Sequence, residues 1–196
     1  MHPEIISLCL FMFVTSCSPG PNNILASYSG FNFGILRTIP HMLGVIIGFT
    51  VLVIIMNFGL INIFQKYPIL QEILKYTGSA FLIYLAYKIS FSKNTSENSN
   101  QNPVKFIETF FFQFINPKSV IVSVIMVSTY VEHGENFISY SFWVIGIAFL
   151  FAIISINFWT LIGKFLRKFA TNEKFIKRFN YVMSFLLLVC IATFYY

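Results

Sequence analysis

Two short proline-containing segments interrupt otherwise apolar stretches, and they carry the residues best suited to bind a ligand. The first is Ser18-Pro19-Gly20-Pro21-Asn22-Asn23, and the second is Asn116-Pro117-Lys118. Proline removes a backbone donor, and a Ser or Asn directly before it favours the start of a helix. Each segment is therefore predicted to end one helix and to begin another within a single apolar run.

A helix start suits an anion because its first N–H groups are unpaired and its macrodipole places about half a positive charge there. Ser18 and Asn116 are the expected N-caps, and Gly20 would let a ligand approach the backbone closely. We expect both helix starts to face one cavity and to hold a carboxylate, with side-chain hydrogen bonds from Asn22, Asn23 and Asn116.

Lys118 is the one cation expected well inside an apolar run. It lies about 12 residues into that run, which corresponds to a depth of about 18 Å in a helix. A charge at such a depth costs about 2.5–3.5 kcal/mol on insertion scales, so a functional role is the first hypothesis. The alternative is that the ammonium snorkels to an interface or bonds the carbonyls freed by Pro117.

Other polar residues in the apolar runs are weaker candidates for a transport path. Gln113 and Asn157 are the ones we add to the predicted binding set, although hydrogen bonding between helices is the more frequent role of such residues. The spacing of Gly44 and Gly48 predicts close helix packing. His41 could titrate near neutrality, but a histidine at the edge of a span is expected at the interface.

The composition indicates a membrane protein. Hydrophobic residues make up 57% of the 196 residues and charged residues 10%, whereas soluble domains carry roughly 25% charged residues. All seven acids are Glu, and the ones near the apolar runs lie at the ends of these runs. No buried carboxylate is therefore expected that could bind a proton or a sodium ion. An intramembrane enzyme would need a nucleophile with a base, or a metal cluster, and the sequence offers neither. No cofactor and no metal are expected.

Six apolar runs of roughly the length of a membrane span follow one another. They cover approximately residues 4–27, 39–62, 68–90, 106–131, 137–161 and 177–196. The predicted fold is thus all-α, with six transmembrane helices arranged as two three-helix halves, 1–91 and 106–196, around a polar linker at 92–105. Three spans per half make any repeat an inverted one, with helices 1 and 4 broken at Pro19/Pro21 and at Pro117.

The positive charges indicate how the chain is oriented. Ten of the 13 Lys and Arg residues lie in the first, third and fifth connectors. The positive-inside rule therefore places these odd connectors in the cytoplasm and both termini outside. Paired broken spans are typical of secondary transporters, whereas a channel would need a ring of selectivity groups.

Three motifs give the chain a family resemblance. The segment at 18–23 resembles the T-P-G-P-N signature of the lysine-exporter (LysE/RhtB) family, with Ser18 in place of Thr. Residues 78–88, G-S-A-F-L-I-Y-L-A-Y-K, are similar to the end of that family's third span. Residues 113–118, Q-F-I-N-P-K, match its Q-x-x-N-P-K element.

The resemblance implies an exporter of a small amino acid across the bacterial inner membrane, driven by an ion gradient, with a proton as the expected coupling ion and no organic cofactor. The branch that exports cysteine and O-acetylserine is the most similar in look, and a homoserine- or threonine-like substrate is also compatible. Export of another small metabolite and a channel are the alternatives. A homo-oligomer is compatible with the resemblance.

Overall fold

The computed structural model describes residues 4–67, 69–91, 103–132, 134–170 and 172–195, and the described part is helical without strands. This confirms the predicted all-α class. Most of the linker predicted at 92–105 lies outside the described residues. The elements are α1 (Ile5–Cys17), α2 (Pro21–Ile55), the π-helix η1 (Met56–Leu60), α3 (Ile61–Lys66), α4 (Ile69–Ser90), α5 (Phe106–Ile115), α6 (Pro117–Tyr130), α7 (Phe137–Arg167) and α8 (Glu173–Ala192).

The long α2 consists of two helical legs that join at Gly34. This residue has φ 74° and ψ 177°, a left-handed backbone conformation that glycine adopts without a Cβ penalty. A second glycine with positive φ, Gly59 at 136°, lies where η1 leads into α3. The chain therefore changes direction at both ends of the second leg of α2.

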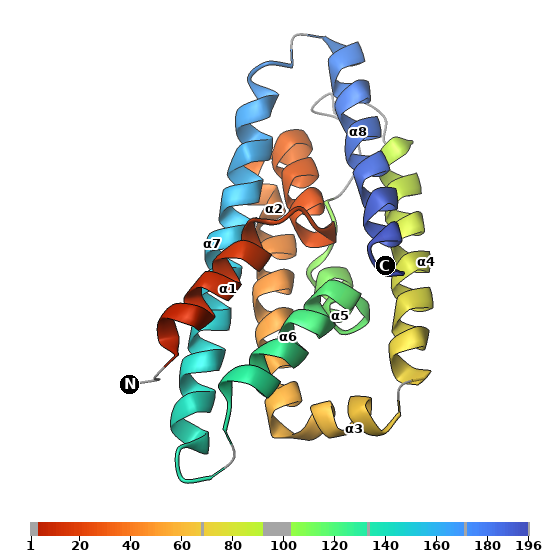
Figure 1. Ribbon diagram of the computed structural model, residues 1–196. Helices are drawn as coiled ribbons and strands as arrows, with labels where there is room; N and C mark the ends of the chain where they lie inside the picture. Colours follow the sequence, from red (N-terminus) through yellow and green to blue (C-terminus); the bar gives the residue numbers. More distant parts are fainter. Residues whose placement is uncertain (1–3, 68, 92–102, 133, 171, 196) are drawn as a thin grey trace.

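Helices distant in sequence pack side by side (Figure 1). The second leg of α2 runs beside α7, α5 also packs on α2, and α4 pairs with α8. Buried apolar residues form two clusters: one joins α1, α2, α6 and α7, and the other joins α2, α4, α5 and α8. The short α3 lies across one end of the bundle.

Glycines allow two of these helix pairs to approach at backbone distance. A Cβ at Gly30 would overlap the carbonyl oxygen of Thr160, and a Cβ at Gly163 would overlap that of Ser27. Cβ atoms at Gly44 and Gly48 would likewise meet the main chain of α5. The packing role predicted for the Gly44 and Gly48 pair is therefore confirmed.

The helices have the length and composition of membrane spans. Within the described residues, three helical stretches are long and apolar enough to cross a bilayer: Pro21–Ile63, Phe137–Arg167 and Glu173–Ala192. The bent pair α5 and α6, which meet at 60°, makes a fourth if it is counted as one span. The protein is thus an all-helical membrane protein. The 13-residue α1 is apolar but shorter than a span, and α4 falls outside this set.

Candidate functional site

The first proline segment separates α1 from α2. Helix α1 ends at Cys17 with Ser18 as its C-cap, and α2 begins with Gly20 as N-cap and Pro21 at its first position. The prediction that Ser18 is an N-cap is therefore wrong, because the proline at 21 disfavours helical geometry at Gly20 and delays the helix start. The Ser18 hydroxyl instead donates to the Thr15 carbonyl at 2.8 Å.

The second proline segment separates α5 from α6. Asn116 caps α6 as predicted: its side-chain oxygen accepts from the Lys118 amide at 3.2 Å, and Pro117 occupies the first helical position. The Asn116 amide group donates in turn to the Ser119 hydroxyl at 3.0 Å. The amino ends of α2 and α6 lie close together in the bundle, around one cavity.

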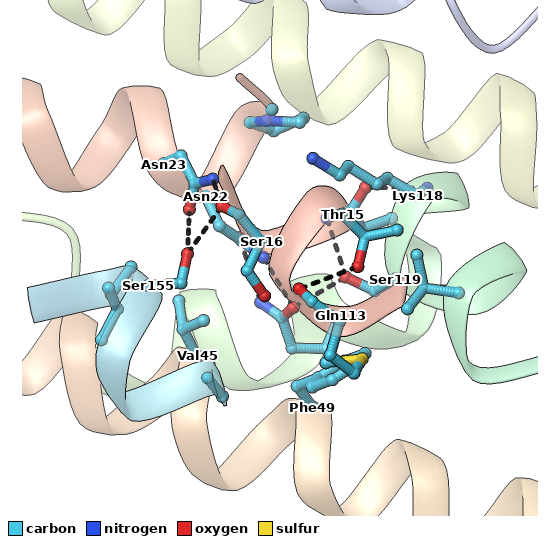
Figure 2. A pocket seen from close by; sticks show the side chains of 17 residues that line it. Thr15, Ser16, Asn22, Asn23, Val45, Phe49, Gln113, Lys118, Ser119 and Ser155 are labelled. Carbon is cyan, nitrogen blue, oxygen red and sulfur yellow. Dashed lines mark hydrogen bonds between the residues drawn. The ribbon is translucent and has the colours of Figure 1, made fainter. Parts of the chain in front are cut away.

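A polar cavity of about 80 Å³ lies where the two segments meet. Figure 2 shows Lys118 on one side of this pocket and Asn23 with Ser155 on the opposite side of the view. Among the described residues that line it, Lys118 is the only charged side chain. Met12, Val45, Phe49, Val122, Ala152 and Ile156 supply its apolar wall.

An amide pair joins the two halves of the chain at this cavity. The Asn22 amide donates to the Gln113 side-chain oxygen at 2.8 Å, and the Gln113 amide donates back to Asn22 at 3.2 Å. The Ser119 hydroxyl also donates to the Gln113 oxygen at 2.9 Å. Gln113 is fully buried, so its hydrogen bonds replace those that water would otherwise make. Side-chain hydrogen bonds thus link the start of α2 to α5, and α5 to α6.

The Asn23 side chain forms hydrogen bonds with main-chain carbonyls at the end of α1. Its amide donates to the Ser16 and Ser18 carbonyls at 2.9 and 3.0 Å. Ser155 of α7 donates to the Ser16 carbonyl at 3.0 Å and to the Asn23 side-chain oxygen at 3.3 Å. A helix end buried in a membrane requires such partners, because lipid offers none.

Lys118 bridges the two proline segments. Its ammonium donates to the Ser18 carbonyl at 3.0 Å and to the Ser18 hydroxyl at 2.8 Å, although the residues lie 100 positions apart. No acid lines the cavity, so the cation rests on neutral oxygens. The alternative that it bonds carbonyls freed by Pro117 is wrong, since the oxygens it reaches belong to the other segment. A positive charge next to a cavity and held only by neutral oxygens remains available to an anion.

The predicted binding residues are almost all in this region. Gly20, Asn22, Asn23, Gln113, Asn116 and Lys118 line the cavity, and Ser18 is bonded to Lys118. Asn157 does not line it, because its amide donates to the Ile153 carbonyl of its own helix at 2.8 Å. A binding role for each of these residues stays a prediction.

His41 lies in an unexpected environment. The prediction of an interfacial position is wrong, because the side chain is fully buried where α2 packs on α5. The main chain of Asn22 faces the ring, but neither ring nitrogen has a well-formed hydrogen-bond partner among the described residues. The Thr109 hydroxyl contacts the His41 carbonyl at 3.4 Å.

Sequence reasoning missed Thr15, Ser16 and Ser119 as lining residues and left Ser155 out of the predicted binding set. A usable signal existed for the first two, because the last turn of a helix that ends at a break leaves carbonyls free. Ser119 follows Lys118 directly and falls in the first turn of α6. No group of three or more His, Cys, Asp or Glu side chains that could hold a metal occurs in the described part of the chain.

Apolar helices of membrane-spanning length, together with two helices, α2 and α6, that begin at proline segments around a polar cavity, define a membrane transport protein. The comparison with known families agrees. The chain belongs to the family of LysE type translocators, which it matches over residues 13–196.

Curated relatives align along their whole length. The cysteine/O-acetylserine efflux protein of Salmonella typhimurium (strain LT2) is 29% identical over 201 residues, covering all of both chains. The protein of the same name from Escherichia coli (strain K12) is 28% identical, again over all of both chains. No solved structure matches this chain.

Proposed function

We propose that the protein is a secondary-active exporter of small amino acids or their derivatives, of the cysteine and O-acetylserine or homoserine and threonine type. It carries them from the cytoplasm across the inner membrane, with a proton as the coupling ion. The observation that carries this proposal is Lys118, whose ammonium lies at the polar cavity with no acid beside it. Membership of the translocator family and the names of the two relatives support it.

The cavity offers a place for each end of a zwitterion. The amino ends of α2 and α6 and the Lys118 ammonium favour a carboxylate. The carbonyls of Ser16 and Ser18 at the carboxyl end of α1 carry the opposite partial charge and suit an α-ammonium group, which would take the place of the Asn23 amide and the Lys118 ammonium bonded there. A free amino acid presents both charges a few bonds apart, so one small molecule can bind both ends of the broken helix.

The topology that fits this function has six spans in two inverted halves. In the first half, α1 and the first leg of α2 form the broken span, followed by the second leg of α2 and by α4. In the second half, α5 and α6 form the broken span, followed by α7 and α8. The end of α7 and the start of α8 lie at one end of the bundle, and α3 and the start of α7 lie at the other (Figure 1).

Transport by purified protein in vesicles tests the function directly. We expect uptake of radiolabelled cysteine, O-acetylserine, serine or homoserine to be saturable, to favour the L isomer and to respond to an imposed pH gradient. Empty vesicles are the control. A flux that does not saturate and appears as an electrical current would instead indicate a channel, and no flux of any amino acid would refute the proposal.

Cysteine accessibility tests the orientation. In a cysteine-free background, Asn136→Cys, in the connector before α7, is expected to react with a membrane-impermeant maleimide from the periplasm. Ser96→Cys, in the linker outside the described residues, is expected to react only after the membrane is permeabilised. Equal labelling of both positions in intact cells contradicts the six-span topology.

A further inference from the structure

A second cavity, of about 280 Å³, lies on the other side of Lys118. It is formed by α1, α6 and the end of α8 together with the first proline segment. Its lining residues are Phe11, Thr15, Pro19, Gly20, Pro21, Lys118, Ile121, Val122, Ile125, Cys190, Thr193 and Phe194. Binding sites for small molecules usually have about 300–1,000 Å³. The polar cavity is far below that range, whereas the second cavity comes close to its lower limit.

The two cavities share a wall. Thr15, Gly20, Pro21, Lys118 and Val122 line both of them. Within this wall the Lys118 side chain lies against Gly20, where an added Cβ would come within 2.9 Å of the Lys118 Cδ and Nζ atoms. The neighbour of Gly20 in this wall is a flexible side chain, so a passage between the cavities would open if the ammonium turned from Ser18 to a bound carboxylate.

The second cavity is apolar in character. Its two threonine hydroxyls donate to carbonyls of their own helices: Thr15 to Phe11 at 2.9 Å and Thr193 to Cys190 at 2.7 Å. Besides the Lys118 side chain, what remains toward the interior is hydrocarbon, the aromatic rings and the Cys190 thiol. No acid is among the residues that line either cavity, so a second cation would find no counter-charge there.

We propose that this second cavity holds the side chain of the transported amino acid and selects uncharged, apolar or sulfur-containing side chains. The inference rests on the proposed function, since it assigns the carboxylate to Lys118 and directs the side chain away from the polar cavity. Basic side chains are rejected because they would lie beside the Lys118 charge. Acidic side chains are rejected because the same ammonium is already paired with the α-carboxylate.

Size variants at Cys190 test this assignment. In vesicles, Cys190→Phe is expected to lower methionine uptake relative to alanine uptake at least tenfold, because the ring fills the cavity. Cys190→Ala should shift the ratio in the opposite direction or leave it at the wild-type value. Val189→Phe, on the half-exposed neighbouring position, is the matched control and should keep the wild-type ratio. Lysine and glutamate uptake by the wild-type protein should remain at the level of empty vesicles.

Protection of the native thiol gives a readout that does not depend on transport. In a Cys9→Ala, Cys17→Ser background, Cys190 is the remaining cysteine. Methionine is expected to slow its reaction with N-ethylmaleimide several-fold, and alanine much less, because alanine leaves the second cavity empty.

The outcomes separate the two proposals. If amino acids are transported but neither the methionine-to-alanine ratio nor Cys190 protection changes, the side-chain assignment is wrong and the cavity is a crevice filled by lipid. Transport of lysine as fast as that of methionine overturns the selectivity argument in the same way. If no amino acid is transported or bound, the proposed function itself fails, and this inference fails with it.

Discussion

Export by a Lys118→Met variant is expected to fall by roughly 30-fold to several thousand-fold, while the protein still reaches the membrane. Methionine keeps the unbranched stem that lies against Gly20 and removes only the charge that bonds Ser18. Removing one partner of a desolvated charge pair costs about 2–5 kcal/mol, and each 1.4 kcal/mol is a factor of ten. The measurement is initial uptake of labelled substrate in vesicles that contain equal amounts of protein.

Two control variants separate the charge from the scaffold. Ser18→Ala removes one of the two oxygens that hold the ammonium and leaves the charge, so a loss below about tenfold is expected, in line with a single hydrogen bond of about 0.5–1.5 kcal/mol. Lys75→Met removes a cation from α4 that lines neither of the two cavities of the site, and should transport normally. Wild-type transport by Lys118→Met would show that this ammonium does not bind the substrate carboxylate.

A second large effect is expected at the contact between α2 and α7. Gly163→Ala places a methyl group on the Ser27 carbonyl, and the reciprocal change Gly30→Ala places one on the Thr160 carbonyl. Overpacking typically costs about 1–3 kcal/mol, and main-chain atoms cannot move aside as a flexible side chain can. Both variants should therefore lower the melting temperature in detergent and reduce the yield of monodisperse protein.

Gly146→Ala is the matched control within α7. An added Cβ there meets nothing within 4 Å, so the substitution removes only the poor helix propensity of glycine. It is expected to raise the free energy of unfolding by up to about 1 kcal/mol. In the same thermal assay, Gly163→Ala is therefore predicted to lower the melting temperature and Gly146→Ala to raise it. Equal, small changes at both positions would contradict the backbone-distance contact between α2 and α7.

Local chemistry explains how much of the site could be predicted from the sequence. Proline and its neighbours restrict their own backbone, so the ends of α1 and α5 and the Asn116 cap follow from short segments alone. The cap at the first segment was misplaced by two residues because two prolines compete there, at 19 and 21. The membrane class follows from composition, which needs no three-dimensional information.

Contacts between segments that are distant in the sequence cannot be predicted from these local backbone preferences. Nothing near Lys118 in the sequence indicates that its ammonium reaches Ser18, or that Gln113 pairs with Asn22. His41 was expected at an interface because only its distance from the end of a run was known. Its burial depends on the reversal at Gly34 and on the packing of α5 over the second leg of α2.

Composition and the proline segments are enough to predict a helical membrane protein whose apolar runs are interrupted by two helix starts, one of them followed by a lysine. Which polar side chains face the cavity depends on how the helices pack. Ser155 lines it and Asn157 does not, although they are two residues apart on α7. The rotation of α7 is set by the close approach of Gly163 to Ser27 and of Thr160 to Gly30, and two residues correspond to about 200° around a helix.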